Sequence, residues 1–261
     1  MSSNNAKSLA AFRNEVGLAG IRYLASTGST NDEALAWAAE GARDLSLVFA
    51  DEQTAGRGRA GRTWFTPAGS ALAFSLILRL TPAERGLVGR FSGLGALALV
   101  AALQKLGLQA QVKWPNDVLI NEKKVAGILV ETVWLGDEVD SLILGMGVNV
   151  DPGSVPPAEA LNFPATCVQS EMMGAIPRLV LLKNLLLELI ALRASLTSES
   201  FLTIWETALA FRERPVRVWM GQAESVSGQI LGLETDGGLR LKTPEGEIRV
   251  IRFGEVHLRP I

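Results

Sequence analysis

The feature that most constrains this 261-residue chain is a run of glycines and arginines between two apolar segments. Within residues 53–64, three glycines alternate with three arginines, and the run ends at Trp64. The flanking segments 45–50 and 72–80 are expected to be β-strands, so the run is a loop attached to a sheet. Glycine lets backbone amides approach a ligand and arginine supplies positive charge, so we expect this loop to bind an anion and close over it. A solvated basic turn would explain neither the apolar neighbours nor Trp64.

Composition excludes several classes of protein. With 48% hydrophobic residues the chain can bury one large core, or one large and one small domain. The net charge of −2 argues against a general nucleic-acid surface, so the basic cluster is local. A single cysteine, Cys167, and a single histidine, His257, argue against disulfides, zinc sites and histidine-centred catalysis. The polar N-terminus and the lack of an apolar run of about 20 residues predict a cytoplasmic protein with no membrane segment.

Upstream of the loop, clustered hydroxyl and amide side chains precede a predicted helix over residues 30–42. Thr30 and Glu33 have the spacing of a capping box. A helix cap alone would explain the pattern. The functional alternative is that Ser29, Thr30 and Asn31 bind an oxygen-rich ligand at the helix N-terminus.

Downstream, we expect a helix over 82–106, a strand over 109–113, a hairpin of 118–120 with 125–134, and a strand over 141–150. Between the first two strands, Pro115 and the turn-forming Asn116 and Asp117 present polar groups at the sheet edge, although a plain β-turn would look similar. From Pro215 onward, short apolar runs alternate with turn residues, which predicts a small antiparallel barrel. We therefore expect two domains, residues 1–212 and 213–261.

Two nucleotide-binding motifs are present only superficially. Residues 56–61 match G-x-G-x-x-G, but they lead into a strand, whereas a dinucleotide-binding loop must open a helix. Residues 93–98 match a looser form inside a predicted helix. The sequence contains no G-x-x-x-x-G-K-[ST], so any nucleotide is bound without a P-loop.

Five motifs in order carry a more specific signal: Ser-Thr-Asn at 29–31, Gly-Arg-Gly-Arg-Ala-Gly-Arg-Thr-Trp at 56–64, Lys-Trp-Pro-Asn-Asp at 113–117, Lys-Val-Ala-Gly-Ile-Leu-Val-Glu at 124–131, and Gly-Met-Gly-Val-Asn at 145–149. Together they resemble the biotin protein ligases, from about residue 20 to the C-terminus. The resemblance implies an α+β fold: a catalytic domain like that of class II aminoacyl-tRNA synthetases, with a mixed sheet flanked by helices, followed by a small SH3-like β-barrel.

Members of that family join biotin to ATP, with Mg²⁺, to give biotinyl-5′-AMP, and then pass biotin to one lysine of a biotin carboxyl carrier protein domain. The resemblance implies Lys124, Arg59 and Asp117 as catalytic residues, with Asp117 either orienting the acceptor lysine or holding the metal. The residues implied around biotin are Ser29, Thr30, Asn31, Gln53, Gly56, Arg57, Gly58, Arg59, Lys124 and Gly127. Those implied at the nucleotide are Arg62, Trp64, Asn116, Asn149 and Arg259.

The sequence departs from the family in two places. Ala60 stands where many relatives carry another arginine, which lowers the charge of the loop. Only some twenty residues precede the first predicted strand, too few for the winged helix-turn-helix of the repressor members, so we expect no DNA binding. We expect a monomer or a weak homodimer, with edge pairing near 125–134 as the candidate contact.

Two rival functions would use some of the same features. A lipoate ligase would have the same fold and the same adenylate chemistry, but the Gly-Arg loop followed by Trp64 favours biotin. A non-catalytic RNA-binding module could use the arginine-glycine segment to contact phosphate, but the acidic pI near 5.6 and the single tyrosine argue against it.

Overall fold

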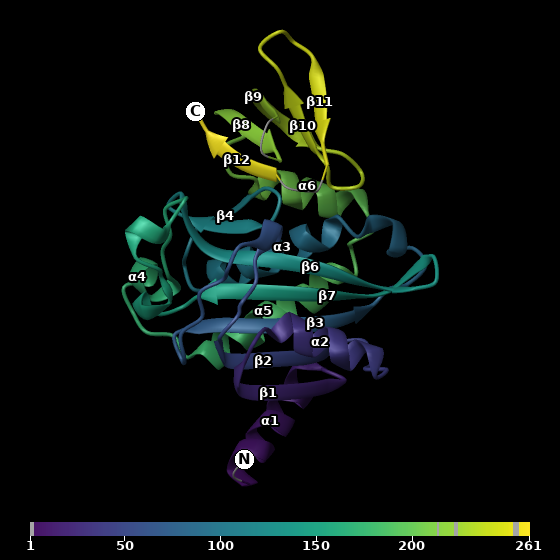
Figure 1. Cartoon of the computed structure of the whole chain (residues 1–261), viewed down its shortest axis with the longest axis vertical. Coiled ribbons are helices and arrows are strands. Elements are labelled where there is room, and N and C mark those ends of the chain that lie inside the picture. Colours follow the sequence, from purple (N-terminus) through teal and green to yellow (C-terminus); the bar gives the residue numbers. More distant parts are fainter. Residues whose placement is uncertain (1–2, 213, 222–223, 253–255) are drawn as a thin grey trace.

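The structure, a computed structural model, describes residues 3–212, 214–221, 224–252 and 256–261. A seven-stranded sheet forms its centre, in the order β1-β2-β3-β7-β6-β5-β4 (Figure 1). The first two strands pair in parallel and every other neighbouring pair is antiparallel, so the sheet is mixed, as expected. The strands are β1 Gly20–Thr27, β2 Ser46–Gln53, β3 Ala71–Arg79, β4 Ala110–Lys113, β5 Asp117–Ile120, β6 Lys123–Leu135 and β7 Glu138–Asn149.

Both faces of this sheet are covered because alternate residues of each central strand point to opposite sides. Leu47, Leu76 and Leu142 belong to a large core with helices α3 and α5, whereas their neighbours belong to a smaller core under α2. The smaller core contains Ala34, Ala38, Val48, Ile77 and Ile143. The helices are α1 Ser3–Val16, α2 Thr30–Ala39, α3 Arg90–Gln104, α4 Val168–Met172, α5 Arg178–Arg193 and α6 Glu199–Ala208. In the described part of the chain, no helix combines the length and apolar character needed to cross a bilayer.

A five-stranded antiparallel sheet, ordered β11-β10-β9-β8-β12, stands at one end of the molecule (Figure 1). Its strands are β8 Pro215–Met220, β9 Glu224–Leu233, β10 Leu239–Lys242, β11 Ile248–Ile251 and β12 Val256–Pro260. Val216, Leu241 and Leu258 from this sheet belong to the same core cluster as α3 and α5. The all-β C-terminal segment is thus present, whereas the boundary after residue 212 stays a prediction.

Three local expectations are wrong. Helix α3 begins at Arg90 rather than Pro82, because residues 85–87 form a separate 3₁₀ turn. Helix α2 ends at Ala39, and its N-cap is Ser29. The capping box does not form, because the Thr30 amide donates to Gln53 Oε1 and Glu33 accepts from Thr27 instead.

Strand β6 is not an edge strand. Its first half lies between β5 and β7, but the β5 pairing covers only residues 123–127. No described strand pairs with residues 129–135 on the β5 side. The expectation of edge pairing is therefore wrong for the first half of β6, and the homodimer stays a prediction that concerns residues 129–135.

Candidate active site

A pocket with about 870 Å³ of empty space, part of it open to solvent, lies at the middle of the large sheet. It is bounded by the N-terminus of α2, the 54–65 loop, the β4–β5 turn, and strands β6 and β7. The lining includes all but three of the residues predicted for binding or catalysis: Ser29, Thr30, Asn31, Gln53, Arg57, Gly58, Arg59, Arg62, Trp64, Asn116, Asp117, Lys124 and Gly127.

Glycines on two neighbouring strands make room for this pocket. Gly127 of β6 is paired in register with Gly147 of β7. Gly145 lies two residues before Gly147 on β7, so it faces the same side of the sheet. A Cβ atom at Gly145 would overlap the Asn31 side chain, and one at Gly147 would overlap the Trp64 indole. The side chains of Asn31 and Trp64 therefore lie directly on the strand backbone, an approach that only glycine allows.

The α2 end of the pocket is a buried network of uncharged polar groups. Gln53 Oε1 accepts from the Thr30 amide at 2.8 Å and lies 3.1 Å from the Thr30 hydroxyl. Ser75 Oγ lies 2.8 Å from Thr30 Oγ1 and 2.5 Å from Asn31 Oδ1. Thr30, Asn31 and Ser75 are buried. Burying polar groups is costly unless they are hydrogen-bonded, so these contacts define a rigid, hydrogen-bonding end of the cavity.

At the opposite end, one carboxylate holds two ammonium groups. Asp117 Oδ2 lies 2.7 Å from Lys113 Nζ, and Asp117 Oδ1 lies 2.6 Å from Lys124 Nζ. Adjacent strands supply the three residues: Lys113 pairs with Asp117, and Asp117 pairs with Gly127 on β6. Burial lowers the pKa of Lys113, although Asp117 opposes this. Burial alone would raise the pKa of Asp117, but the two lysines outweigh it and hold the pKa well below the usual range.

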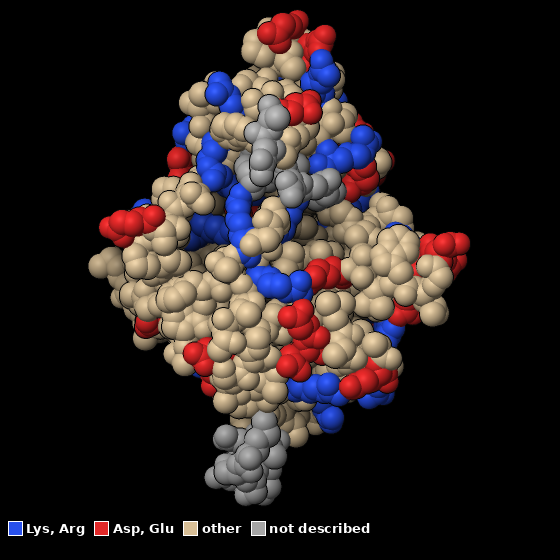
Figure 2. Space-filling view, in the orientation of Figure 1, with Lys and Arg blue, Asp and Glu red and all other residues tan. Residues whose placement is uncertain are grey.

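Arg59 adds a further positive charge to the lysine end. Its Nη1 donates to Asn116 Oδ1 at 3.1 Å, and Asn116 Nδ2 donates to the Ile128 carbonyl of β6 at 2.9 Å. Burial lowers the pKa of the Arg59 guanidinium, and Asp117 opposes this shift. Figure 2 shows Lys and Arg side chains gathered at the hollow between the C-terminal sheet and the large sheet. This arrangement concentrates positive charge where an anionic ligand would enter.

The glycine-arginine loop is folded over the pocket as an irregular hairpin. The amide of Gly58 donates to the Arg62 carbonyl at 2.7 Å, and the amide of Trp64 donates to the Gly56 carbonyl at 2.8 Å. Trp64 lies 5.3 Å from Lys124 Nζ, measured to the ring centroid, and its indole nitrogen is buried without a hydrogen-bond partner in the described part of the chain. The loop therefore places the Trp64 ring beside Lys124, and its closure over an anion stays a prediction.

Comparison with known proteins identifies the family. Residues 23–149 match the biotin/lipoate A/B protein ligase family, and residues 213–259 match the biotin protein ligase C-terminal domain. The chain is 38% identical, over 89% of its length and 98% of the relative's, to a biotin--[acetyl-CoA-carboxylase] ligase of Paracoccus denitrificans. The chain belongs to the biotin protein ligase family. It is therefore a ligase, and the resemblance seen in the five motifs is confirmed.

Other relatives agree in sequence and in fold. A bifunctional ligase/repressor BirA of Bacillus subtilis is 34% identical over 90% of this chain and 72% of its own length. The solved biotin protein ligase from Aquifex aeolicus, in complex with biotin and ATP, superposes with a TM-score of 0.79 at 28% identity, covering 94% of this chain and 100% of that one. The predicted α+β fold is confirmed by this likeness.

Three predicted ligase residues do not line the pocket. Asn149 is buried and donates to the Thr166 carbonyl at 3.0 Å. Arg259 lies 4.8 Å from the Phe163 ring centroid, and Lys113 lies 5.0 Å from the same centroid, so Arg259 stands near the lysine end without lining the pocket. Gly56 lies in the base of the loop, where a Cβ atom would crowd the Trp64 carbonyl. Their assignments to nucleotide and biotin stay predictions.

Several residues of this biotin protein ligase site were absent from the sequence prediction of functional residues. Ser75 is the one hydroxyl residue in the largely apolar strand β3, and Phe163 lies in a proline-rich segment. Neither position therefore carries a local sequence pattern that would mark it as functional. Lys113 was predicted only as the last residue of a strand and the first of the 113–117 motif. Its pairing with Asp117 could have been suspected, because the two residues lie at the ends of strands joined by a three-residue turn.

Proposed function

We propose that this ligase activates biotin with ATP to give biotinyl-5′-AMP and then transfers biotin to a lysine of a carboxyl carrier protein domain. The observation that carries the proposal is the polarity of one pocket: hydrogen-bonding groups at one end and three cationic side chains at the other, with a glycine surface between them. Biotin has a matching distribution of polar groups, because its ureido ring forms hydrogen bonds, its tail is apolar and its carboxylate is anionic.

In this proposal the α2 end binds the ureido ring. Thr30, Asn31 and Gln53 present amide and hydroxyl groups there, with Ser29 and the amide of Gly58 nearby. The apolar tail would lie against the Trp64 indole, which packs on the backbone of Gly127 and Gly147, and the carboxylate would then reach Lys124. A site built to hydrogen-bond its ligand discriminates strongly against a ligand that lacks those groups. Lipoate, whose dithiolane ring is apolar, would leave this network unpaired.

The first step brings two anions together. A biotin carboxylate oxygen forms a bond to the α-phosphorus of ATP while the bond to the bridging oxygen breaks and pyrophosphate leaves. Lys124, Lys113 and Arg59 supply positive charge where negative charge accumulates, and they are already held in place, so the stabilisation is largely electrostatic and positional. Asn116, Arg62, Trp64 and Arg259 are proposed to contact the nucleotide.

In the second step the amine of the carrier lysine attacks the acyl carbonyl, AMP leaves, and the amine loses one proton to water. Asp117 was expected either to orient that amine or to hold the metal. Both of its oxygens accept from lysines, so we infer that it positions Lys113 and Lys124. The described residues include no group of three His, Cys, Asp or Glu that could hold a metal. These residues do not fit a Mg²⁺ site at Asp117, and we propose that Mg²⁺ arrives with the triphosphate of ATP.

The proposal is tested by incubating the protein with labelled biotin, Mg-ATP and a carboxyl carrier domain. Label on the carrier's lysine is expected, and label must be absent when the lysine is replaced. Biotin-dependent exchange of pyrophosphate into ATP isolates the first step, and lipoate offered in place of biotin tests specificity. Exchange with lipoate but not with biotin would overturn the assignment.

We further propose that the enzyme acts in the cytoplasm on this carrier, as a monomer or weak homodimer, and does not bind DNA. The names of two relatives include acetyl-CoA-carboxylase, which supports a carboxylase carrier as acceptor. A mobility-shift experiment with the protein's own operon DNA tests the last point, because tight sequence-specific binding would contradict it. Sedimentation with and without biotin and ATP tests the oligomeric state.

A further inference from the structure

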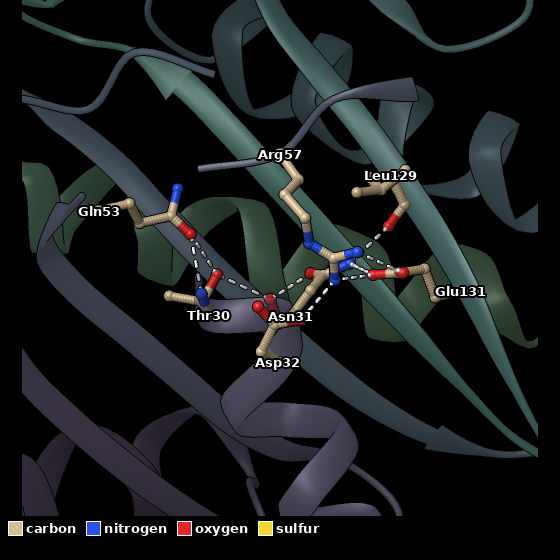
Figure 3. Close-up of polar contacts among 8 residues, drawn as sticks. Thr30, Asn31, Asp32, Gln53, Arg57, Leu129 and Glu131 are labelled. Atoms are coloured by element: carbon tan, nitrogen blue, oxygen red, sulfur yellow. Dashed lines mark hydrogen bonds and ion pairs between the residues drawn. The ribbon is translucent and has the colours of Figure 1, made fainter. Parts of the chain in front are cut away.

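The three arginines of the loop do not point the same way. Arg59 donates to Asn116 at the lysine end of the pocket. The Arg57 guanidinium instead contacts two carboxylates on other elements (Figure 3). Its Nη1 and Nη2 donate to the two oxygens of Glu131 on β6, at 3.0 and 2.8 Å. Its Nη2 also donates to Asp32 Oδ1 on α2, at 2.6 Å. We call Arg57, Asp32 and Glu131 the Arg57 cluster.

The Arg57 cluster joins the loop to the hydrogen-bonding end of the pocket. Glu131 Oε2 also accepts from Asn31 Nδ2, at 2.6 Å (Figure 3). From Asn31, contacts continue through Ser75 and Thr30 to Gln53, whose amide donates to Thr66 at the other end of the loop. Both sides of the base of the loop, at Arg57 and at Thr66, are therefore held by one continuous set of polar contacts that passes through the residues proposed to hold the ureido ring.

The charge of its surroundings also distinguishes Arg57 from Arg59. Arg57 is matched by two carboxylates, so the cluster carries a net charge of −1 and is a poor partner for an anionic ligand. A two-point Arg–carboxylate contact is stronger and more directional than an ordinary surface ion pair. Glu131 is about one quarter exposed, which limits the screening of that contact.

We propose that Glu131 and Asp32 are positioning residues that hold the loop closed through Arg57, and that Glu131 couples closure to biotin recognition through Asn31. This inference rests on the proposed function for its coupling to biotin, but not for the closure itself. In this proposal the side chain of Arg57 holds the loop closed. The cationic contacts to the substrates come from Arg59, Lys113 and Lys124.

The test uses the double variant Asp32→Asn with Glu131→Gln. Both substitutions keep the side-chain shape, and the amide oxygen introduced at position 131 can still accept from Asn31, but both ion pairs to Arg57 are lost. The control is Glu40→Gln, which removes the Arg22–Glu40 pair at the other end of α2. That pair has the same side-chain exposures, 40% and 61%, as the Arg57–Asp32 pair.

The first measurement is tryptic cleavage of the ligand-free protein after Arg57, Arg59 or Arg62. We expect the double variant to be cut in the loop roughly tenfold faster than wild type, because an open loop is the cleavable form. Raising the salt concentration should speed cleavage of wild type and leave the double variant unchanged, since only wild type has ion pairs to screen. Glu40→Gln should behave as wild type. Equal cleavage of the double variant and wild type, with equal thermal stability, would overturn the closure role.

The second measurement is kinetic. We expect the KM for biotin and the rate of adenylate release to rise about tenfold in the double variant, with the KM for ATP within about twofold of wild type. A global folding defect would raise both KM values and lower the melting temperature, and it would overturn the coupling. If wild type itself fails to adenylate biotin, the proposed function fails, and the cleavage experiment still decides whether the Arg57 cluster closes the loop.

Discussion

Asp117 sets the charge balance at the reactive end of the pocket. It lies between Lys113 and Lys124 at hydrogen-bonding distance from both, and all three come from neighbouring strands. With the carboxylate ionised, the three groups sum to a single positive charge instead of two uncompensated ones. Buried lysines of like charge would otherwise repel each other and resist burial. The carboxylate thus offsets the repulsion between two lysine side chains at this end of the pocket.

Asp117 makes stability depend on pH in a definite direction. Its pKa is lower in the folded protein than the ordinary value of 3.8, so it stabilises the fold above that value and the stabilisation is lost as the pH falls further. Asp117→Asn should cost about 3 kcal/mol near neutral pH, because it leaves buried Lys113 and partly buried Lys124 without their anion. It should also flatten the loss of stability in acid.

Denaturant titrations at a series of pH values measure both effects. Asp137→Asn, at an exposed position on the β6–β7 hairpin, is the matched control and should reproduce the wild-type curve. If Asp117→Asn lost as much stability between neutral and acid pH as wild type does, the two lysines would not be depressing its pKa.

Lys124 is the cation expected closest to the reacting carboxylate. Lys124→Met removes its charge while keeping most of the side chain's length, so the rate of biotin-dependent pyrophosphate exchange should fall by about 100-fold or more. Transfer from separately supplied biotinyl-5′-AMP to the carrier should fall less, because the bond between the carboxylate and the α-phosphate has already formed. Lys183→Met, which removes an exposed pair with Glu15, is the control. An equal loss in both steps would mean that Lys124 serves transfer as much as activation.

At the scale of elements, the 54–65 loop has a conformation that its sequence supports only in part. Gly61 has a φ of +70°, which suits glycine, but Ala60 beside it has a φ of +55°, which costs a non-glycine residue about 1 kcal/mol. The backbone contacts between Gly58 and Arg62 close the hairpin despite that cost. The folded loop therefore carries a local backbone cost that opening would relieve, which suits the proposed role of a segment that admits substrates and then retains an intermediate.

Arg59→Ala should speed the release of biotinyl-5′-AMP by about tenfold, because the contact of the guanidinium with Asn116 ties the loop to the β4–β5 turn. The off-rate of labelled adenylate, measured by rapid filtration, gives the answer. Arg22→Ala, a surface arginine on β1, serves as the control. A wild-type off-rate in Arg59→Ala would show that retention does not depend on this arginine.

The loop also shows what a sequence reveals and what it does not. The glycine-arginine run between apolar segments was enough to place a loop over a sheet, because composition and periodicity are local signals. The Arg57 cluster was not predictable, since Asp32 and Glu131 lie 25 and 74 positions away from Arg57 and meet it only through the strand order. The capping box failed for the same reason: Gln53, 23 positions from Thr30, takes the groups that would have formed it.

For the molecule as a whole, the C-terminal sheet is attached to the catalytic region beside the site. Trp114, in the turn between Lys113 and Asp117, donates its indole N–H to the Gly237 carbonyl at 3.0 Å. Buried Arg90 at the start of α3 donates to the carbonyls of Thr235 and Leu196, at 2.7 and 2.6 Å. The β9–β10 turn thus fixes the turn that presents Asn116 and Asp117. The all-β composition of this segment was readable from sequence, but its contact with the site was not.

Arg90→Leu tests whether the two sheets form one cooperative unit. The substitution keeps the apolar volume but leaves buried carbonyls on both sides of the interface without their donor, at a cost of about 1–3 kcal/mol for each orphaned group. Because one core cluster spans both sheets, wild type should show equal protection from hydrogen exchange in residues 138–149 and 224–233, and Arg90→Leu should lose protection first in the latter. The rate of pyrophosphate exchange should fall together with this protection, since the 114–117 turn loses its contact with the β9–β10 turn. If both segments of Arg90→Leu kept equal protection while activity fell, the C-terminal sheet would act on the site through some contact other than this one.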